Sequence, residues 1–280
     1  MNVSDILDSV KNGKISVNEA KKQLSLYSIE EIENFAKIDL GREARKGVPE
    51  VVFAERKENS EVKKIIKNVL KKTNSIVVSR IPKKNFQDIC NYCKKNDLKV
   101  SVGQNCTTIL VYKKPLKKTK GKIGIITAGT SDIGIAEESR LMCESMGCSC
   151  ITSYDVGIAG LHRIFPVLKE FVKAGVDAII VVAGMEGALA SVVSSTVNVP
   201  IVGVPTSIGY GYGEKGIAAL AAMLQSCSLG LTVVNIDNGG RKQSWITIET
   251  PVPGAAVVHM VAAEFVRCEQ GKSHLAGWRS

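Results

Sequence analysis

The sequence predicts an α/β protein in which a small α+β domain precedes a parallel β-sheet covered by helices on both faces. Near-continuous apolar segments recur after residue 122 with helical patterns between them, which is typical of strands buried on both faces. A lysine-rich run, Lys113 to Lys122, contains Pro115 and Gly121 and separates this regular part from a less regular first part. A chain of 280 residues has room for two such domains, each with its own core.

These observations divide the chain into four segments. We expect an N-terminal α+β domain over residues 1–113, a basic linker over 114–122, a parallel-sheet domain over 123–240 and a tail over 241–280.

The first domain begins with two predicted helices. A Ser followed three residues later by a Glu is a capping box, and this pattern places helix starts at Ser16 and Ser28. A lysine-rich amphipathic helix follows, with its apolar face between Val62 and Leu70. The other elements expected here are strands over 51–54, 75–79, 99–102 and 107–112 and a helix over 84–95.

The second domain is predicted to contain five parallel strands, over 123–128, 149–156, 178–183, 201–204 and 231–236. The carboxyl ends of parallel strands share one edge of the sheet, so we expect the functional groups in the loops after them. These loops are rich in glycine, which permits close approach of the backbone to a ligand.

The loop after the first of these strands is a candidate anion site. Small residues lead from Thr127 to Ser131, and Asp132 then begins a helical pattern. Unpaired N–H groups at a helix start attract phosphate or carboxylate, although a strand–turn–helix with such caps is also ordinary α/β construction. The glycine fingerprints of dinucleotide-dependent redox enzymes and of P-loop ATPases do not occur at this loop, which argues against both classes.

The charge and the cysteines of the sequence limit which binding partners and which cell compartment we expect. The net charge of +10 is concentrated in lysines at 63–72 and 113–122. Such lysines suit a nucleic-acid partner. They also suit a solvated helix face and a basic linker, which attract a polyanionic small substrate. No interleaved aromatic residues accompany these lysines, so nucleic acid is disfavoured.

Eight cysteines without disulfide spacing, an acidic N-terminal segment and no membrane-length apolar run predict a cytoplasmic protein without a membrane partner. Cys90 and Cys93 form a CxxC, which we assign to a buried helix face rather than to zinc.

The loops of the second domain resemble those of the LarB family, the pyridinium-3,5-biscarboxylic acid mononucleotide synthases. The matching segments are TAGTSD, DVGIAGLHR, VAGMEGALASVV, VPIVGVPTSIGYG, MLQSCSLG and VVNIDNG, and GREARKGVPEVVFAE resembles the N-terminal domain of that family. The likeness runs from Asp39 to Gly239. The second domain is also similar to aminoimidazole ribonucleotide (AIR) carboxylase, PurE, at the Ser131–Asp132 turn, the His162–Arg163 pair and the VPIVGVP strand.

The resemblance implies a flavodoxin-like, PurE-like three-layer αβα domain and a homo-oligomer formed through it. LarB enzymes carboxylate C5 of the pyridinium ring of nicotinic acid adenine dinucleotide and hydrolyse its phosphoanhydride. The products are pyridinium-3,5-biscarboxylic acid mononucleotide and AMP, in the first step of nickel-pincer nucleotide biosynthesis. The resemblance implies CO₂ or bicarbonate as co-substrate and no tightly bound cofactor, and it leaves open whether Mg²⁺ assists.

The same resemblance assigns the catalytic roles. Cys227, in the SC motif, corresponds to a nucleophile, and Glu186, in Gly-Met-Glu-Gly, to a base. By composition alone, Cys227 reads as a buried cysteine at a helix end and Glu186 as an acid favoured by a helix dipole.

Binding roles follow from the resemblance in the same way. The residues that it places against the substrate are Ser131, Asp132, His162 and Arg163, with Arg42, Arg45 and Lys57 closing over it from the first domain. From the residues themselves, Ser131 and Asp132 are also plausible helix caps, and His162 with Arg163 a structural pair. For the three basic residues of the first domain, the pattern alone slightly favours a solvated surface.

The chain departs from the LarB pattern after Gly239, which leaves the last layer without an assigned fold. Two other functions stay open at this stage. One is PurE-type carboxylation of aminoimidazole ribonucleotide, which needs no thiol and does not explain the first domain. The other is nucleic-acid binding by the lysine-rich first domain.

Overall fold

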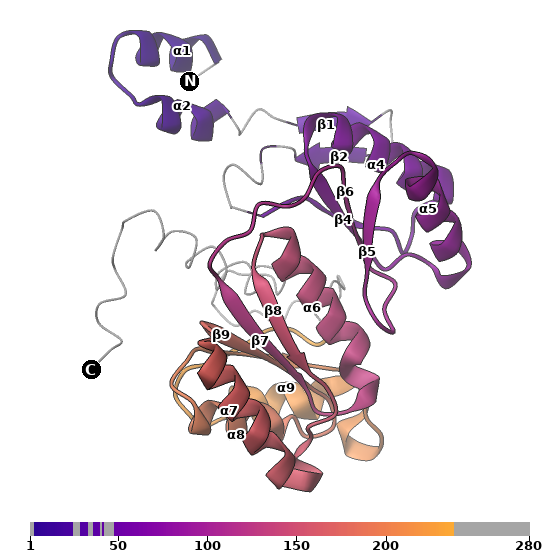
Figure 1. Cartoon of the computed structure of the whole chain (residues 1–280), viewed down its shortest axis with the longest axis vertical. Coiled ribbons are helices and arrows are strands. Elements are labelled where there is room, and N and C mark those ends of the chain that lie inside the picture. Colours follow the sequence, from indigo (N-terminus) through magenta and orange to yellow (C-terminus); the bar gives the residue numbers. More distant parts are fainter. Residues whose placement is uncertain (1–2, 25–28, 33–35, 40, 42–47, 238–280) are drawn as a thin grey trace. The chain divides into compact units, whose positions relative to one another are not determined.

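The computed structural model of the chain describes residues 3–24, 29–32, 36–39, 41 and 48–237 (Figure 1). The chain divides into two compact units, Met1–Val100 with Leu110–Leu116, and Ser101–Ile109 with Lys117–Ser280. We expected 101–109 in the first domain, but these residues group with the second unit, where the Gln104 backbone amide donates to the Glu137 carboxylate. The predicted tail, 241–280, lies outside the described residues.

The first unit begins with helices α1 (Val3–Lys11) and α2 (Val17–Leu24). The predicted cap of α2 is present, since the Glu19 amide donates to the Ser16 hydroxyl at 3.1 Å. The helix predicted from Ser28 is wrong: residues 29–32 form strand β1 (Ile29–Ile32), antiparallel to β2 (Ala36–Asp39). A cap satisfies one or two backbone groups, whereas pairing with β2 engages the backbone of the whole segment.

A four-stranded sheet of order β3-β4-β6-β5 follows, with β3 (Val51–Phe53), β4 (Ser75–Ser79), β5 (Lys99–Val102) and β6 (Ile109–Tyr112). Strands β3 and β4 are parallel. The accompanying helices are α4 (Asn59–Lys72) and α5 (Lys83–Lys95). Helix α4 buries the predicted apolar face between Val62 and Leu70.

The CxxC cysteines lie on the buried face of α5, as predicted. Burial raises the pKa of Cys90, and it raises the pKa of Cys93 to about 12. Both side chains are therefore neutral thiols at physiological pH.

The second unit contains a five-stranded sheet of order β11-β10-β9-β7-β8, in which every neighbouring pair is parallel. Its strands are β7 (Lys122–Thr127), β8 (Ser149–Ser153), β9 (Ala178–Ala183), β10 (Ile201–Pro205) and β11 (Leu231–Val233). Read from β8, this is the flavodoxin-like order 2-1-3-4-5, with its switch point between β7 and β9. The predicted α/β class and flavodoxin-like fold are confirmed.

Helices cover both faces of this sheet (Figure 1). Right-handed crossovers put α6 (Ile133–Ser145) on one face and α7 (Ile164–Ala174), α8 (Ala188–Thr196) and α9 (Ile217–Leu224) on the other. The core beneath the second group includes Ile126, Phe171, Leu189 and Met223. A Cβ atom at Gly124 would lie 2.5 Å from the Phe171 ring, so this strand position accommodates only glycine without a shift.

Two strands, β8 and β11, end three residues earlier than predicted. Strand β8 stops at Ser153, because Asp155 adopts a left-handed φ of 59° and its amide donates to the Thr127 hydroxyl. Strand β11 stops at Val233, and the chain turns so that the Asp237 amide donates to the Pro205 carbonyl.

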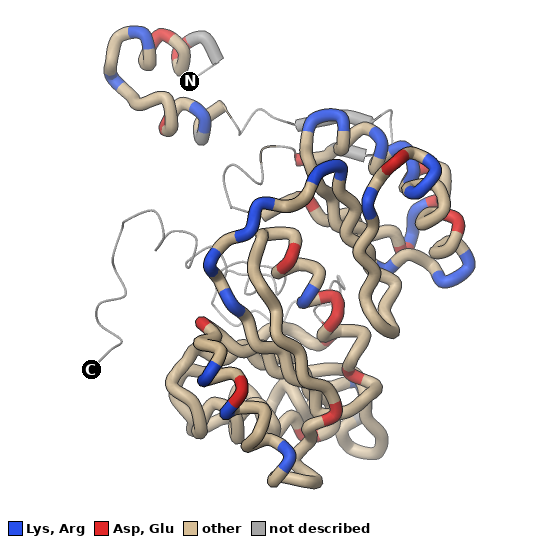
Figure 2. The backbone as a smooth tube through the Cα atoms, viewed as in Figure 1, with Lys and Arg blue, Asp and Glu red and all other residues tan. Residues whose placement is uncertain are grey.

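Lysine residues are concentrated along α4 and along the stretch 113–122 (Figure 2). One of the α4 lysines, Lys63, is paired with Asp88 of α5 at 2.6 Å and lies over the Tyr92 ring. No helix in the described part of the chain combines the length and the apolar composition that a membrane crossing requires.

Candidate active site

The loops after the five parallel strands are bonded to one another. The Thr127 hydroxyl, at the end of β7, accepts from the Asp155 amide in the loop after β8 at 3.0 Å. The Thr206 hydroxyl, after β10, donates to Asp132, after β7, at 2.7 Å. Two further bonds join the loops after β9, β10 and β11: Met185 N–H to Ile208 O at 2.9 Å and Ser207 N–H to Asp237 Oδ1 at 2.7 Å. The carboxyl edge of the sheet therefore carries one connected layer of loops.

Asp132 is the buried carboxylate of this layer, only 3% exposed. Its Oδ1 accepts from Thr206 and its Oδ2 from the Gly129 amide at 2.9 Å. Burial raises the pKa of Asp132 and the nearby charge of Asp237 adds to the rise, while the two hydrogen bonds oppose it. Both carboxylate oxygens thus accept hydrogen bonds from the protein. A contact of Asp132 with substrate stays a prediction. The preceding Ser131 is exposed and open to a ligand.

Glu186 lies in the turn between β9 and α8, and its side chain is exposed. The turn is tightly constrained: Met185 has a φ of 54°, and a Cβ atom at Gly184 would lie 2.1 Å from the Ile208 carbonyl oxygen. A non-glycine residue in the left-handed region is strained and persists only where the surroundings hold it. The strained backbone of Met185, next to Glu186, therefore indicates that the layer of loops holds this turn in place.

Cys227 lies in the connection between α9 and β11, at the amino end of its strand rather than in a loop at the carboxyl edge. Its thiol is free and exposed, so the buried helix-end reading from composition does not hold. The residues on either side, Ser226 and Ser228, hydrogen-bond to Ser191 of α8. Glu186 lies two residues before α8 begins, so both predicted catalytic residues adjoin this helix in the chain or through hydrogen bonds of their neighbours.

His162 and Arg163 are both exposed at the end of a 3₁₀ turn, Ile158–Arg163. The Arg163 guanidinium donates to the carbonyl oxygens of Asp155 at 3.0 Å and Gly157 at 3.3 Å, and it lies 3.7 Å from the Asp155 carboxylate. Arg163 thus holds the loop after β8 in shape. Its phosphate contact, and that of His162, stay predictions.

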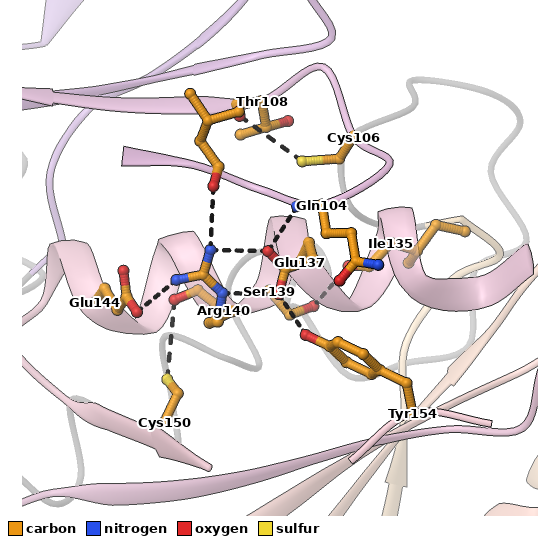
Figure 3. A network of polar contacts seen from close by, with 11 residues as sticks. Gln104, Cys106, Thr108, Ile135, Glu137, Ser139, Arg140, Glu144, Cys150 and Tyr154 are labelled. Atoms are coloured by element: carbon orange, nitrogen blue, oxygen red, sulfur yellow. Dashed lines mark hydrogen bonds and ion pairs between the residues drawn. The ribbon is translucent and has the colours of Figure 1, made fainter. Parts of the chain in front are cut away.

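A polar network on α6 was not predicted from the sequence (Figure 3). The Glu137 carboxylate accepts from Arg140 Nε at 2.7 Å, Arg140 Nη2 at 2.8 Å, the Gln104 amide at 2.8 Å and the Tyr154 hydroxyl. Arg140 also pairs with Glu144 at 2.6 Å. The spacing of three and four residues between these charges was the available signal, because it places them on one helix face.

The network affects the pKa values of its members. Burial alone would raise the pKa of Glu137, but the hydrogen bonds from Arg140, Tyr154 and Gln104 outweigh it, so this pKa lies below its usual value. Burial and the bond to Glu137 raise the pKa of Tyr154 to about 12. Glu137 is therefore a charged structural anchor for the residues just after β5 and β8.

Comparison with known proteins identifies the family. A family model described as the LarB/PurE-like N-terminal domain matches residues 29–112, and one described as AIR carboxylase matches residues 122–250. An uncharacterized protein of Methanocaldococcus jannaschii is 45% identical over 242 residues, which cover 85% of this chain and 93% of that relative. The chain belongs to the LarB family. The second match runs past Gly239, where the likeness in the sequence was expected to end.

Other relatives of this LarB chain are mutases. A probable N5-carboxyaminoimidazole ribonucleotide mutase of Methanothermobacter thermautotrophicus is 30% identical over 125 residues, 43% of this chain and 35% of the relative. The N5-carboxyaminoimidazole ribonucleotide mutase of Pyrococcus horikoshii is 27% identical over 128 residues, 44% of this chain and 68% of the relative. The family relationship is thus to carboxylase and mutase enzymes.

The remaining predicted residues of the LarB site belong to the first unit. Arg42 and Arg45 lie outside the described residues. Lys57 is half-buried in the turn after β3, where its amide donates to the Ala54 carbonyl at 3.1 Å. The closing of these three residues over a substrate stays a prediction. Within the described ranges, no group of three or more His, Cys, Asp and Glu side chains is arranged to hold a metal ion.

Proposed function

We propose that this LarB-family protein carboxylates C5 of the pyridinium ring of nicotinic acid adenine dinucleotide with CO₂ and hydrolyses the phosphoanhydride. The products are pyridinium-3,5-biscarboxylic acid mononucleotide and AMP. The observation that carries the proposal is that a LarB-family chain has an exposed thiol, Cys227, on a segment bonded to α8, and an exposed carboxylate, Glu186, in the turn just before that helix.

The thiol solves the main chemical difficulty. A pyridinium ring is electron-poor, so its C5 does not attack CO₂ unaided. When the Cys227 thiolate forms a C–S bond to a ring carbon next to C5, the ring becomes a neutral dihydropyridine. The nitrogen lone pair then makes C5 nucleophilic, and C5 forms the new bond to CO₂.

Glu186 completes the exchange of a proton for a carboxylate. After carboxylation, C5 carries both a hydrogen and the new carboxylate. Glu186 removes this proton, and the C–H electrons form a ring double bond. The C–S bond then breaks, the sulfur leaves as thiolate with the bonding pair, and the aromatic pyridinium returns. The released proton passes from Glu186 to solvent.

The substrate phosphates have a suitable place at the start of α6. Thr130 and Ser131 are exposed there, ahead of the buried Asp132 that ties this turn to Thr206. Hydroxyl groups and amides at a helix start favour phosphate. We assign the binding of the dinucleotide phosphates and ribose to this turn, with His162, Arg163, Arg42, Arg45 and Lys57 as further contacts.

The direct test is incubation of the purified protein with nicotinic acid adenine dinucleotide and ¹³C-bicarbonate. We expect AMP and a mononucleotide that carries one labelled carboxylate, both detected by mass spectrometry. Parallel reactions with EDTA and with Mg²⁺ decide whether the metal assists hydrolysis. Cys227→Ala should abolish labelling, with Cys150→Ala, a half-buried cysteine of β8, as the matched control. A folded wild-type protein that forms neither product overturns the proposal.

A second candidate is the mutase or carboxylase reaction on aminoimidazole ribonucleotides. The AIR carboxylase match and the mutase relatives favour it. It leaves the LarB-type domain matched at residues 29–112 unexplained. Turnover of N5-carboxyaminoimidazole ribonucleotide that persists in Cys227→Ala would select this function instead. Nucleic-acid binding gains no comparable support, and Lys63 of the basic helix is already paired with Asp88.

We extend the proposal to a homo-oligomer formed through the second unit. Large apolar side chains are exposed in the loop after β10, on α9 and in the segment after α9: Tyr210, Tyr212, Ile217, Leu224 and Leu229. Large apolar side chains left exposed on one chain are available for burial in a subunit contact. Light scattering at micromolar concentration should give a mass above that of one chain, and Tyr212→Glu should lower it.

A further inference from the structure

The segment that carries Cys227, residues 225–230, is held on α8 by side-chain hydrogen bonds. The Ser191 hydroxyl donates to Ser226 Oγ at 2.9 Å, and the Ser228 hydroxyl donates to the Ser191 carbonyl oxygen at 3.2 Å. The Ser228 amide also donates to Ser226 Oγ at 3.2 Å. Both neighbours of Cys227 are thus bonded to one residue of a helix.

A further bond extends the attachment along α8. The Ser194 hydroxyl, one helical turn beyond Ser191, donates to the Leu229 carbonyl oxygen at 2.8 Å. Ser195 is different: its hydroxyl donates within the helix to the Val192 carbonyl oxygen at 2.9 Å and is exposed. The face of α8 with Ser191 and Ser194 holds the cysteine segment, whereas the neighbouring Ser195 provides an internal comparison.

We propose that Ser191 is a positioning residue for the Cys227 nucleophile. This inference rests on the proposed function. A nucleophile on a connecting segment loses conformational freedom when it attacks, unless the fold has already fixed it. Ser191 is bonded to the residues on both sides of Cys227, through its hydroxyl to Ser226 and through its carbonyl oxygen to Ser228, and α8 begins two residues after Glu186.

Ser191 does not contact the thiol in this arrangement, so its removal should act on the geometry of attack. We expect Ser191→Ala to lower kcat by roughly 10–100-fold, the effect of a small misplacement of a reacting group, with a much smaller change in KM. Ser191→Thr keeps the hydroxyl and should restore kcat to within a few-fold. Ser195→Ala should match the wild type. Equal activity of Ser191→Ala and Ser195→Ala would overturn the inference.

A second measurement does not depend on the substrate. Hydrogen exchange followed by mass spectrometry should show faster exchange in peptides covering 225–230 for Ser191→Ala than for Ser195→Ala, because the Ser228 amide bonds to a hydroxyl that Ser191 holds. Unchanged exchange in Ser191→Ala contradicts a holding role of the Ser191 hydroxyl, since the bond to its carbonyl oxygen remains in this variant. An inactive wild type with faster exchange in Ser191→Ala overturns the proposed function and leaves the attachment intact. An active wild type with normal kcat in Ser191→Ala overturns only the inference.

Discussion

The Thr206 hydroxyl lies 2.7 Å from Oδ1 of Asp132, a buried contact between residues 74 positions apart in the chain. It joins the loop after β10 to the loop after β7, two strands that are separated in the sheet by β9. The exposed turn with Ser131 therefore depends on a residue at the end of a different strand.

Replacing Thr206 by Val should destabilise the second unit by about 1–3 kcal/mol, because Oδ1 of a buried carboxylate loses its donor. Thr206→Ser keeps the hydroxyl and should cost less. The free energy of unfolding from urea denaturation measures both effects. An equal loss in the two variants would show that packing, rather than the hydrogen bond, stabilises this contact.

Asp132 should make stability depend on pH in a specific direction. Its pKa is raised in the folded protein above the usual 3.8, so the folded state binds the proton more tightly than the unfolded state. The stabilisation by protonated Asp132 is complete below pH 3.8 and is lost as the pH rises through the raised pKa. Over this window the wild type should lose stability relative to Asp132→Asn, by at most about 1.4 kcal/mol per pH unit. A difference between the two proteins that does not vary with pH would contradict the raised pKa.

Arg140 should stabilise the second unit through Glu137. Arg140→Met leaves a buried carboxylate without its main partner, and we expect a loss of roughly 3 kcal/mol in the free energy of unfolding. The exposed pair Lys63–Asp88 is the matched comparison, and Lys63→Met should cost no more than about 1 kcal/mol. Arg140→Lys keeps the charge but loses the two-pronged contact and should lie between these values.

The Glu137 network also predicts a pH dependence of the opposite sign. The pKa of Glu137 is lowered from the usual 4.5, so its stabilisation is complete above pH 4.5 and is lost as the pH falls through the lowered pKa. In Arg140→Met this acid-dependent loss should shrink. Denaturation curves between pH 3 and pH 7 provide the comparison, and identical pH profiles would exclude Arg140 as the source of the shift.

Glu186→Gln should separate the steps of the proposed reaction. Without the base, the C5 proton stays in place and the thiolate is not expelled, so a covalent adduct on Cys227 should accumulate. Turnover should fall roughly 10²–10⁴-fold. Intact-protein mass spectrometry should show the added mass in Glu186→Gln and not in the double variant with Cys227→Ser. Glu170→Gln, an exposed carboxylate of α7, is the control, and normal turnover in Glu186→Gln would remove this residue from the mechanism.

The sequence by itself determined the class of the fold and the family. The apolar runs of β7, β9 and β10 identify buried parallel strands because burial on both faces demands continuous hydrophobicity. The loop motifs identified the LarB family, which the comparisons confirm. At Ser28 the local pattern did not predict the secondary structure correctly, because the capping box is followed by a strand. Pairing of β1 with β2 overrides the local preference for helix.

Only the tertiary structure decided which of these residues act together. The sequence contains Asp132, Thr206, Ser191 and Cys227 but not their contacts, because side-chain pairing between distant segments follows from strand order and crossover. Asp132 reads as a ligand or a cap in the sequence, and in the fold its carboxylate ties two loops together. Cys227 reads as buried in the sequence, and in the fold it is exposed on a segment that serines on both sides bind to α8.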